Sequence, residues 1–177
     1  FQEKVEVVGI LDDETSKHGS FIKGTKVIGS LSALSEMKRR DKVDSIICAV
    51  SSSIPYRRRV RNLAKQLDVP LVNAIHPTAY FDDGVELGLG NYFGAFCYVG
   101  ANSIIGNNCF FSSRTTIEHH NLVGNDVTTG PNVATSGSCV IGDGVKFAAG
   151  IVVENKISIG QDAVVSSGAA ITSDVAP

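Results

Sequence analysis

The 177-residue sequence lacks any apolar stretch that approaches membrane-spanning length, so we expect no transmembrane segment. It contains no glycine-rich loop of the kind that cradles phosphate groups. Histidine is scarce, and of the four only His119 and His120 fall in the repeat described below. A protein zinc site needs three or four ligands, and an adjacent pair at a turn diverges. We therefore expect no metal site.

The charge of the chain is nearly balanced at -2 but unevenly distributed. Before residue 76 there are 13 basic and 9 acidic residues, a balance of +4; after it there are 3 and 9, a balance of -6. The basic blocks Lys38-Arg39-Arg40 and Arg57-Arg58-Arg59 lie in separate predicted helices and lack interleaved aromatic residues. This favours a solvated basic face, or contact with a phosphate-bearing ligand, over nucleic-acid binding.

The first 75 residues alternate apolar runs with helical patterns. Strands are expected at Val5–Leu11, Asp44–Val50 and Pro70–Ile75, with helices from about Ser32 to Arg40 and from about Tyr56 to Gln66. Such alternation predicts an α/β domain with a parallel sheet, Rossmann-like but without its first strand. We therefore expect two domains, a truncated Rossmann-like domain at 1–75 and a repeat domain at 76–177.

Ligands of open parallel sheets bind beyond the carboxyl ends of the strands. In this chain those ends carry Asp12, Asp13 and Ser51. The chain begins at Phe1 rather than methionine and stops abruptly at Pro177. We expect it to be a fragment of a longer protein.

A six-residue frame runs unbroken from Phe81 to Ile171. Fourteen of its sixteen positions are apolar, the exceptions being Thr129 and Thr135, and the next residue is often glycine. A period of six is neither helical nor a plain strand alternation; it is typical of a hexapeptide β-helix. Three hexads make one coil, so residues 18 apart stack at about the 4.8 Å spacing of paired strands.

The stacking predicts where the cysteine and histidine side chains of the repeat lie. Cys97, Cys109 and Cys139 occupy the small interior position on three different faces, which predicts reduced core residues of a cytoplasmic protein. His119 and His120 fall in an outward turn, with Gly137 one coil above His119. One interpretation is two solvated turn histidines. The other is a general base beside a free backbone donor, which is what acyl transfer requires.

The order of motifs resembles a known family. A strand ends in Leu11-Asp12-Asp13, a Val27-Ile28-Gly29-Ser30-Leu31 segment follows, then Ile75-His76-Pro77-Thr78-Ala79, and then hexads carrying Ile117-Glu118-His119. This resembles the nucleotide-sugar and sialic-acid O/N-acetyltransferase family, hexapeptide-repeat acyltransferases of bacterial surface-glycan biosynthesis. The resemblance implies a left-handed parallel β-helix, a homotrimer, and acetyl-CoA bound between subunits.

The resemblance also implies roles for individual residues. His119 matches the general base and Gly137 the glycine whose amide meets the acetyl carbonyl. Ala149 and Ser167 match the lining of the CoA groove, and Asp12, Asp13 and Ser51 match the contacts with the nucleotide sugar. Thr128 stands where well-known members have a second histidine, and it can donate one hydrogen bond to the cofactor. His120 stands where members usually have an acidic residue that orients the base.

The sequence therefore predicts an acetyl-CoA-dependent acetyltransferase that acts on an amino or hydroxyl group of a nucleotide-activated sugar, with His119, Gly137 and His120 as catalytic residues. Lys146 and Lys156 are candidates for the CoA phosphates, or simply solvated surface residues. Two alternatives stay open: an acyltransferase for another small amine or sugar, and a catalytically idle trimeric module that binds a nucleotide sugar or serves as a scaffold.

Overall fold

The computed structural model describes residues 6–177. Its contacts divide the chain into two compact units. One contains the chain up to Ile46 together with Asn62–Pro70, and the other contains Ile47–Arg61 together with Leu71–Pro177. The predicted boundary at residue 75 and the roles given to the two domains stay predictions.

The first unit is built on three short strands. Its elements are β1 (Ile10–Leu11), the 3-10 helix η1 (Thr15–Lys17), β2 (Phe21–Ile22), β3 (Thr25–Gly29) and α1 (Ala33–Arg39). The sheet order is β1-β3-β2, with β1 parallel and β2 antiparallel to β3. Val27, Leu31 and Leu34 are buried in this unit. Ser32 precedes α1 as the sequence predicts.

The structure does not show the predicted Rossmann-like sheet. Of the expected first strand only Ile10–Leu11 is extended, and Val5 lies outside the described residues. The apolar run Asp44–Val50 forms no strand, because it pairs with none of the described strands; one of its backbone hydrogen bonds runs from Ile46 N–H to Pro70 O at 3.0 Å. Ala74–Ile75 is extended, but it pairs with Tyr92–Phe93 of the repeat.

Helix α2 (Ile54–Gln66) begins where the sequence leads one to expect a helix. Ser53 Oγ accepts a hydrogen bond from the N–H of Tyr56 at 3.3 Å, which satisfies one of the unpaired amides of the first turn. Pro55 stands within that turn, where the missing N–H costs nothing.

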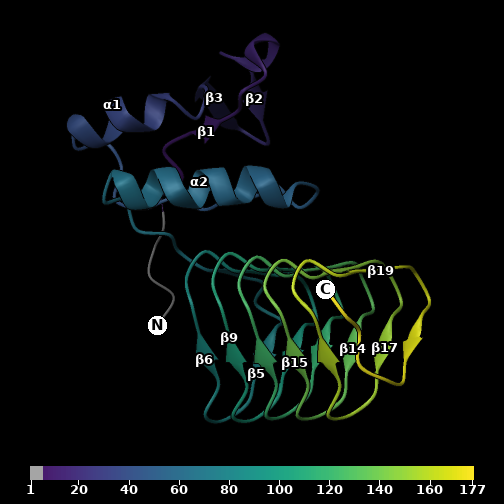
Figure 1. The fold of residues 1–177 in the computed structure, drawn as a ribbon. Helices are drawn as coiled ribbons and strands as arrows, with labels where there is room; N and C mark the ends of the chain where they lie inside the picture. Colours follow the sequence, from purple (N-terminus) through teal and green to yellow (C-terminus); the bar gives the residue numbers. More distant parts are fainter. Residues whose placement is uncertain (1–5) are drawn as a thin grey trace. The chain divides into compact units, whose positions relative to one another are not determined.

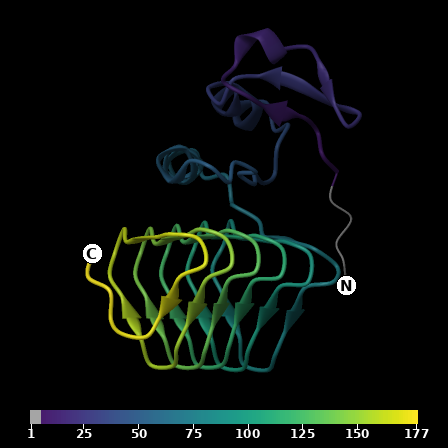
Figure 2. The same ribbon diagram turned by 90° about the vertical axis from the view of Figure 1, so that its right-hand side faces the viewer.

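The second unit is a parallel β-helix, in which short strands stack coil upon coil (Figures 1 and 2). Each strand pairs in parallel with the strand 18 residues away, as in Phe110 with Thr128 and Ile117 with Thr135. The predicted coil of three hexads is therefore confirmed.

Three sheets form the faces of this β-helix. The first sheet contains β4 (Ala74–Ile75), β7 (Tyr92–Phe93), β10 (Phe110–Phe111), β13 (Thr128–Thr129), β16 (Lys146–Phe147) and β19 (Val164–Val165). The second contains β5 (Tyr80–Phe81), β8 (Tyr98–Val99), β11 (Thr116–Ile117), β14 (Ala134–Thr135), β17 (Val152–Val153) and β20 (Ala170–Ile171). The third contains β6 (Glu86–Leu87), β9 (Ile104–Ile105), β12 (Leu122–Val123), β15 (Val140–Ile141) and β18 (Ser158–Ile159).

The core of the β-helix consists of the residues of the six-residue frame and the small residues two positions earlier. Phe93, Phe111 and Phe147 are fully buried, and the rings of Phe93 and Phe111 stack at 4.9 Å. At each turn between strands, one residue adopts the left-handed backbone conformation with positive φ. This residue is often Asn, Asp or Gly, which tolerate that conformation best. This repeated turn fixes what lies at each corner.

The three repeat cysteines are buried, as predicted. Their thiols reach main-chain oxygens one coil above: Cys97 to Ser112, Cys109 to Gly124 and Cys139 to Glu154, at 3.1–3.2 Å. Burial raises the pKa of the Cys109 thiol to about 12. Of the two polar frame residues, Thr129 Oγ1 contacts Thr115 Oγ1 at 2.7 Å, whereas buried Thr135 Oγ1 has no partner among residues 6–177.

Candidate active site

His119 and His120 form the turn between β11 and β12, and both side chains are exposed. His120 holds the left-handed position of the turn, with φ 58°. Its N–H donates to Ala101 O at 2.9 Å in the coil below, and His119 O accepts from Ser138 N–H at 2.9 Å in the coil above. Both backbones are therefore fixed by the neighbouring coils.

Gly137 lies directly against the His119 imidazole. A Cβ atom added at Gly137 would stand 2.5 Å from Cε1 and 2.7 Å from Nε2 of that ring, closer than any real side chain could approach. The N–H of Gly137 has no acceptor within the described part of the chain. The stacking derived from the repeat thus places an imidazole and an unpaired backbone donor at one corner.

The two imidazoles contact each other edge to face. Their Nδ1 atoms are 3.0 Å apart, the ring centroids are 5.2 Å apart, and the ring planes meet at 84°. A hydrogen bond between two imidazole nitrogens requires one ring to donate and the other to accept. His120 therefore occupies the position of a hydrogen-bond partner to His119.

The residues assigned to the cofactor lie elsewhere on the coil. Ala149 and Ser167 follow β16 and β19 in the first sheet, and Ala149 O accepts from the N–H of Gly168 at 2.9 Å. They share one corner, whereas His119 and Gly137 follow strands of the second sheet and share another. Thr128 lies in β13 and is only 7% exposed.

Two of the residues assigned to the nucleotide sugar, Asp12 and Asp13, accept hydrogen bonds within the first unit. Asp12 accepts hydrogen bonds from Glu14 N–H at 2.9 Å and Lys17 Nζ at 3.0 Å, and these bonds, in that order, lower the pKa of its carboxyl group. Asp13 accepts from Leu31 N–H at 2.9 Å. Ser51 precedes α2 and belongs to the other compact unit.

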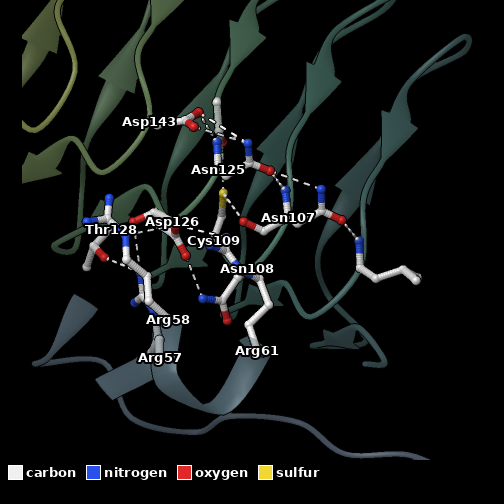
Figure 3. A network of polar contacts seen from close by, with 12 residues as sticks. Arg57, Arg58, Arg61, Asn107, Asn108, Cys109, Asn125, Asp126, Thr128 and Asp143 are labelled. Atoms are coloured by element: carbon white, nitrogen blue, oxygen red, sulfur yellow. Dashed lines mark hydrogen bonds and ion pairs between the residues drawn. The ribbon is translucent and has the colours of Figure 1, made fainter. Parts of the chain in front are cut away.

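Three arginines of α2 form a polar cluster that sequence reasoning missed (Figure 3). The prediction of a solvated basic face is wrong for Arg57, whose side chain is 1% exposed. Its Nη2 donates to Asp126 O at 3.0 Å and to Thr128 Oγ1 at 2.7 Å. Desolvation lowers the pKa of the Arg57 guanidinium.

The carboxylate of Asp126 is the centre of this cluster. It is 3% exposed and receives Arg58 Nε at 3.0 Å, Arg61 Nη1 at 2.9 Å and Asn108 Nδ2 at 2.6 Å (Figure 3). Arg58 also reaches Asp162 at 3.0 Å. The available signal was the opposite charge of the two halves of the chain, together with the i, i+4 spacing of Arg57 and Arg61 on one helical face.

Within residues 6–177 no group of three or more His, Cys, Asp or Glu side chains is arranged to hold a metal ion. None of the helices described in this range is long and apolar enough to cross a membrane.

Comparison with known proteins gives matches of two kinds, although no family model matches the chain. The acetyltransferase domain of PglB from Neisseria gonorrhoeae, solved with acetyl coenzyme A, is 26% identical with a TM-score of 0.86; the match covers 95% of this chain and 79% of that one. PerB from Caulobacter crescentus, solved with CoA and GDP-perosamine, is 25% identical with a TM-score of 0.83, covering 95% and 78%.

Among curated proteins, the acyl-(acyl-carrier-protein)–UDP-N-acetylglucosamine O-acyltransferase of Brucella ovis is 51% identical over 43 residues. This match covers 24% of the present chain and 16% of the length of that relative. The structural likeness is thus far broader than the sequence likeness.

Proposed function

We propose that this chain, whose solved structural relatives are sugar-nucleotide acetyltransferases of the hexapeptide-repeat family, transfers an acetyl group from acetyl-CoA to a nucleotide-activated sugar. The resemblance drawn from the sequence is confirmed by these relatives. The acceptor is an amino or hydroxyl group of a sugar used in bacterial surface-glycan biosynthesis. The observation that carries the proposal is the His119 imidazole packed against Gly137, whose N–H is unpaired among the described residues.

His119 is the general base of the proposed reaction. Its Nε2 takes a proton from the acceptor amine or hydroxyl as that atom attacks the thioester carbonyl, forming a carbon–nitrogen or carbon–oxygen bond. The N–H of Gly137 donates to the oxyanion of the tetrahedral intermediate, which is typically worth about 3 kcal/mol. The carbon–sulfur bond then breaks, and the CoA thiolate receives the proton from His119.

A homotrimer of left-handed β-helices, with the active site between subunits, accounts for the separation of the cofactor residues from His119. The first sheet contains Thr128 and is followed by the turns of Ala149 and Ser167, away from the corner that bears His119. One chain alone therefore does not bring these cofactor residues next to the proposed base. The outward residues of the three middle strands of the third sheet form an apolar stripe: Ile104, Leu122 and Val140 are 45%, 48% and 46% exposed. We assign this stripe to contact between copies of the chain.

The nucleotide part of the acceptor is assigned to the amino-terminal domain, with Asp12 and Asp13 as its contacts; Ser51, in the other compact unit, is a separate candidate. Lys146 is exposed on β16, within the sheet that also precedes the turns of Ala149 and Ser167, which supports a place near the CoA phosphates. The protein is proposed to act in the cytoplasm.

Thiol release from acetyl-CoA, measured with a panel of nucleotide sugars, tests the proposed function. The panel contains nucleotide sugars with a 4-amino group, such as GDP-perosamine, and matched sugars with a hydroxyl group at that position. Turnover with either type supports the proposal and identifies the acceptor atom. Absence of turnover across the panel would contradict it, and turnover confined to free amines or free sugars would replace it with an acyltransferase of another acceptor.

A further inference from the structure

The contact between His119 and His120 joins equivalent atoms. Both partners are Nδ1, at 3.0 Å, and a neutral imidazole carries a proton on only one of its two nitrogens. A single proton therefore lies between the rings, and the ring that supplies it must leave its own Nε2 unprotonated. The ring that accepts it must carry its proton on Nε2. The two histidines are thus locked in opposite tautomers.

The proposed role of His119 as the base selects which ring donates. His119 is the ring that lies against Gly137: Cε1 is the ring atom nearest to a Cβ built on the glycine, at 2.5 Å, and Nε2 follows at 2.7 Å. An Nε2 that takes a proton must be unprotonated beforehand, so His119 must hold its proton on Nδ1 and donate it to His120. The reverse pair of tautomers would place a proton on Nε2 of His119 and leave it unable to act as a base.

We propose that His120 is a positioning residue whose Nδ1 accepts the Nδ1–H of His119 and so keeps Nε2 of His119 free to act as the base. This inference rests on the proposed function. As Nε2 gains the acceptor's proton, the donor ring becomes an imidazolium, and its Nδ1–H bond to His120 becomes charge-assisted and stronger. The bond therefore stabilises the state that follows proton transfer more than the state that precedes it.

The backbone conformation at this corner permits variants that remove or replace the His120 ring without straining the turn. His120 has φ 58°, so His120→Gly removes the ring while relieving the left-handed strain. His120→Asn also suits this conformation, and its amide oxygen accepts a hydrogen bond without adding charge. Asp162→Gly is a matched control, because Asp162 holds the same turn position with φ 58° at the corner that follows the third sheet.

Steady-state kinetics of these variants give the first test. We expect His120→Gly to lower kcat on the order of 10- to 100-fold with KM changed less than about twofold, and His120→Asn to restore most of the loss. Asp162→Gly should retain the parental kcat. Parental kcat in His120→Gly, or equal impairment in His120→Gly and His120→Asn, would overturn the proposal.

Nitrogen-15 NMR of histidine-labelled protein gives a test that does not need activity. With both rings neutral, we expect the proton of His119 on Nδ1 and that of His120 on Nε2; the opposite tautomers would overturn the proposal. The two failures are distinguishable. A parent chain without turnover removes the proposed function, while NMR still decides which of the two rings donates the hydrogen bond. An active parent with an unaffected His120→Gly variant removes only the role of His120.

Discussion

Substitution of Gly137 by alanine displaces the proposed base without touching it. The new Cβ would stand 2.5 Å from Cε1 and 2.7 Å from Nε2 of His119. Carbon atoms in ordinary contact lie about 3.5–4.0 Å apart, so the imidazole must move by about 1 Å. A displacement of about 1 Å in a catalytic group can lower the rate on the order of 100-fold, or about 2.7 kcal/mol of transition-state stabilisation.

The folded state should tolerate this change well. Gly137 has no left-handed φ, its amide stays in place, and the atoms that a Cβ meets belong to a movable exposed side chain rather than to backbone. We therefore expect Gly137→Ala to keep the parental unfolding midpoint while kcat/KM for acetyl transfer falls.

The double variant Gly137→Ala/His119→Ala provides the control. If the glycine acts by placing the imidazole, the double variant should be no less active than His119→Ala alone, because the two changes remove the same interaction. Parental kcat/KM in Gly137→Ala, together with a parental unfolding midpoint, would refute the reasoning.

Three further predictions concern stability, pH and assembly. Asp126→Asn should lower the free energy of unfolding by about 2 kcal/mol in urea titrations, because Arg58 and Arg61 lose a buried carboxylate. Asp162→Asn removes an exposed partner of Arg58 and should change the free energy of unfolding little. Equal effects of the two substitutions would contradict the central role of Asp126 in the arginine cluster. The raised pKa of Cys109 should leave its thiol unreactive in native protein at pH 8. Because the folded state binds the Cys109 proton more tightly than the unfolded state, the thiol's contribution to the free energy of unfolding is complete below about pH 8.5 and declines as pH rises toward 12. Reaction of the Cys109 thiol in native protein at pH 8 would contradict the raised pKa. Leu122→Glu should convert the proposed homotrimer to monomers in sedimentation velocity, and a trimer that persists in the variant would place the interface elsewhere.

The six-residue frame predicted the β-helix because it encodes its own contacts. Each inward residue stacks on the residue 18 positions away, so the place of Gly137 above His119 followed from counting. The same counting placed Cys97, Cys109 and Cys139 in the interior.

The contacts of α2 could not be found in this way. Arg57 meets Asp126 and Thr128 across 69 and 71 residues of sequence, between elements with different periods. No periodic rule connects a helical face to a corner of the coil, so the sequence predicts a solvated Arg57 where the structure has a buried one. The strand predicted at Asp44–Val50 is absent for a related reason. Composition favours a strand there, but a strand forms only where the edge of another strand is available for pairing.

Acetyl transfer by the His119→Ala variant tests the central claim most directly. Thiol release from acetyl-CoA is measured for the parent and the variant with the nucleotide sugar that the parent accepts best, at matched folded concentrations. The account predicts a loss of kcat on the order of 100- to 10,000-fold in the variant. Turnover by His119→Ala at the parental rate would contradict it.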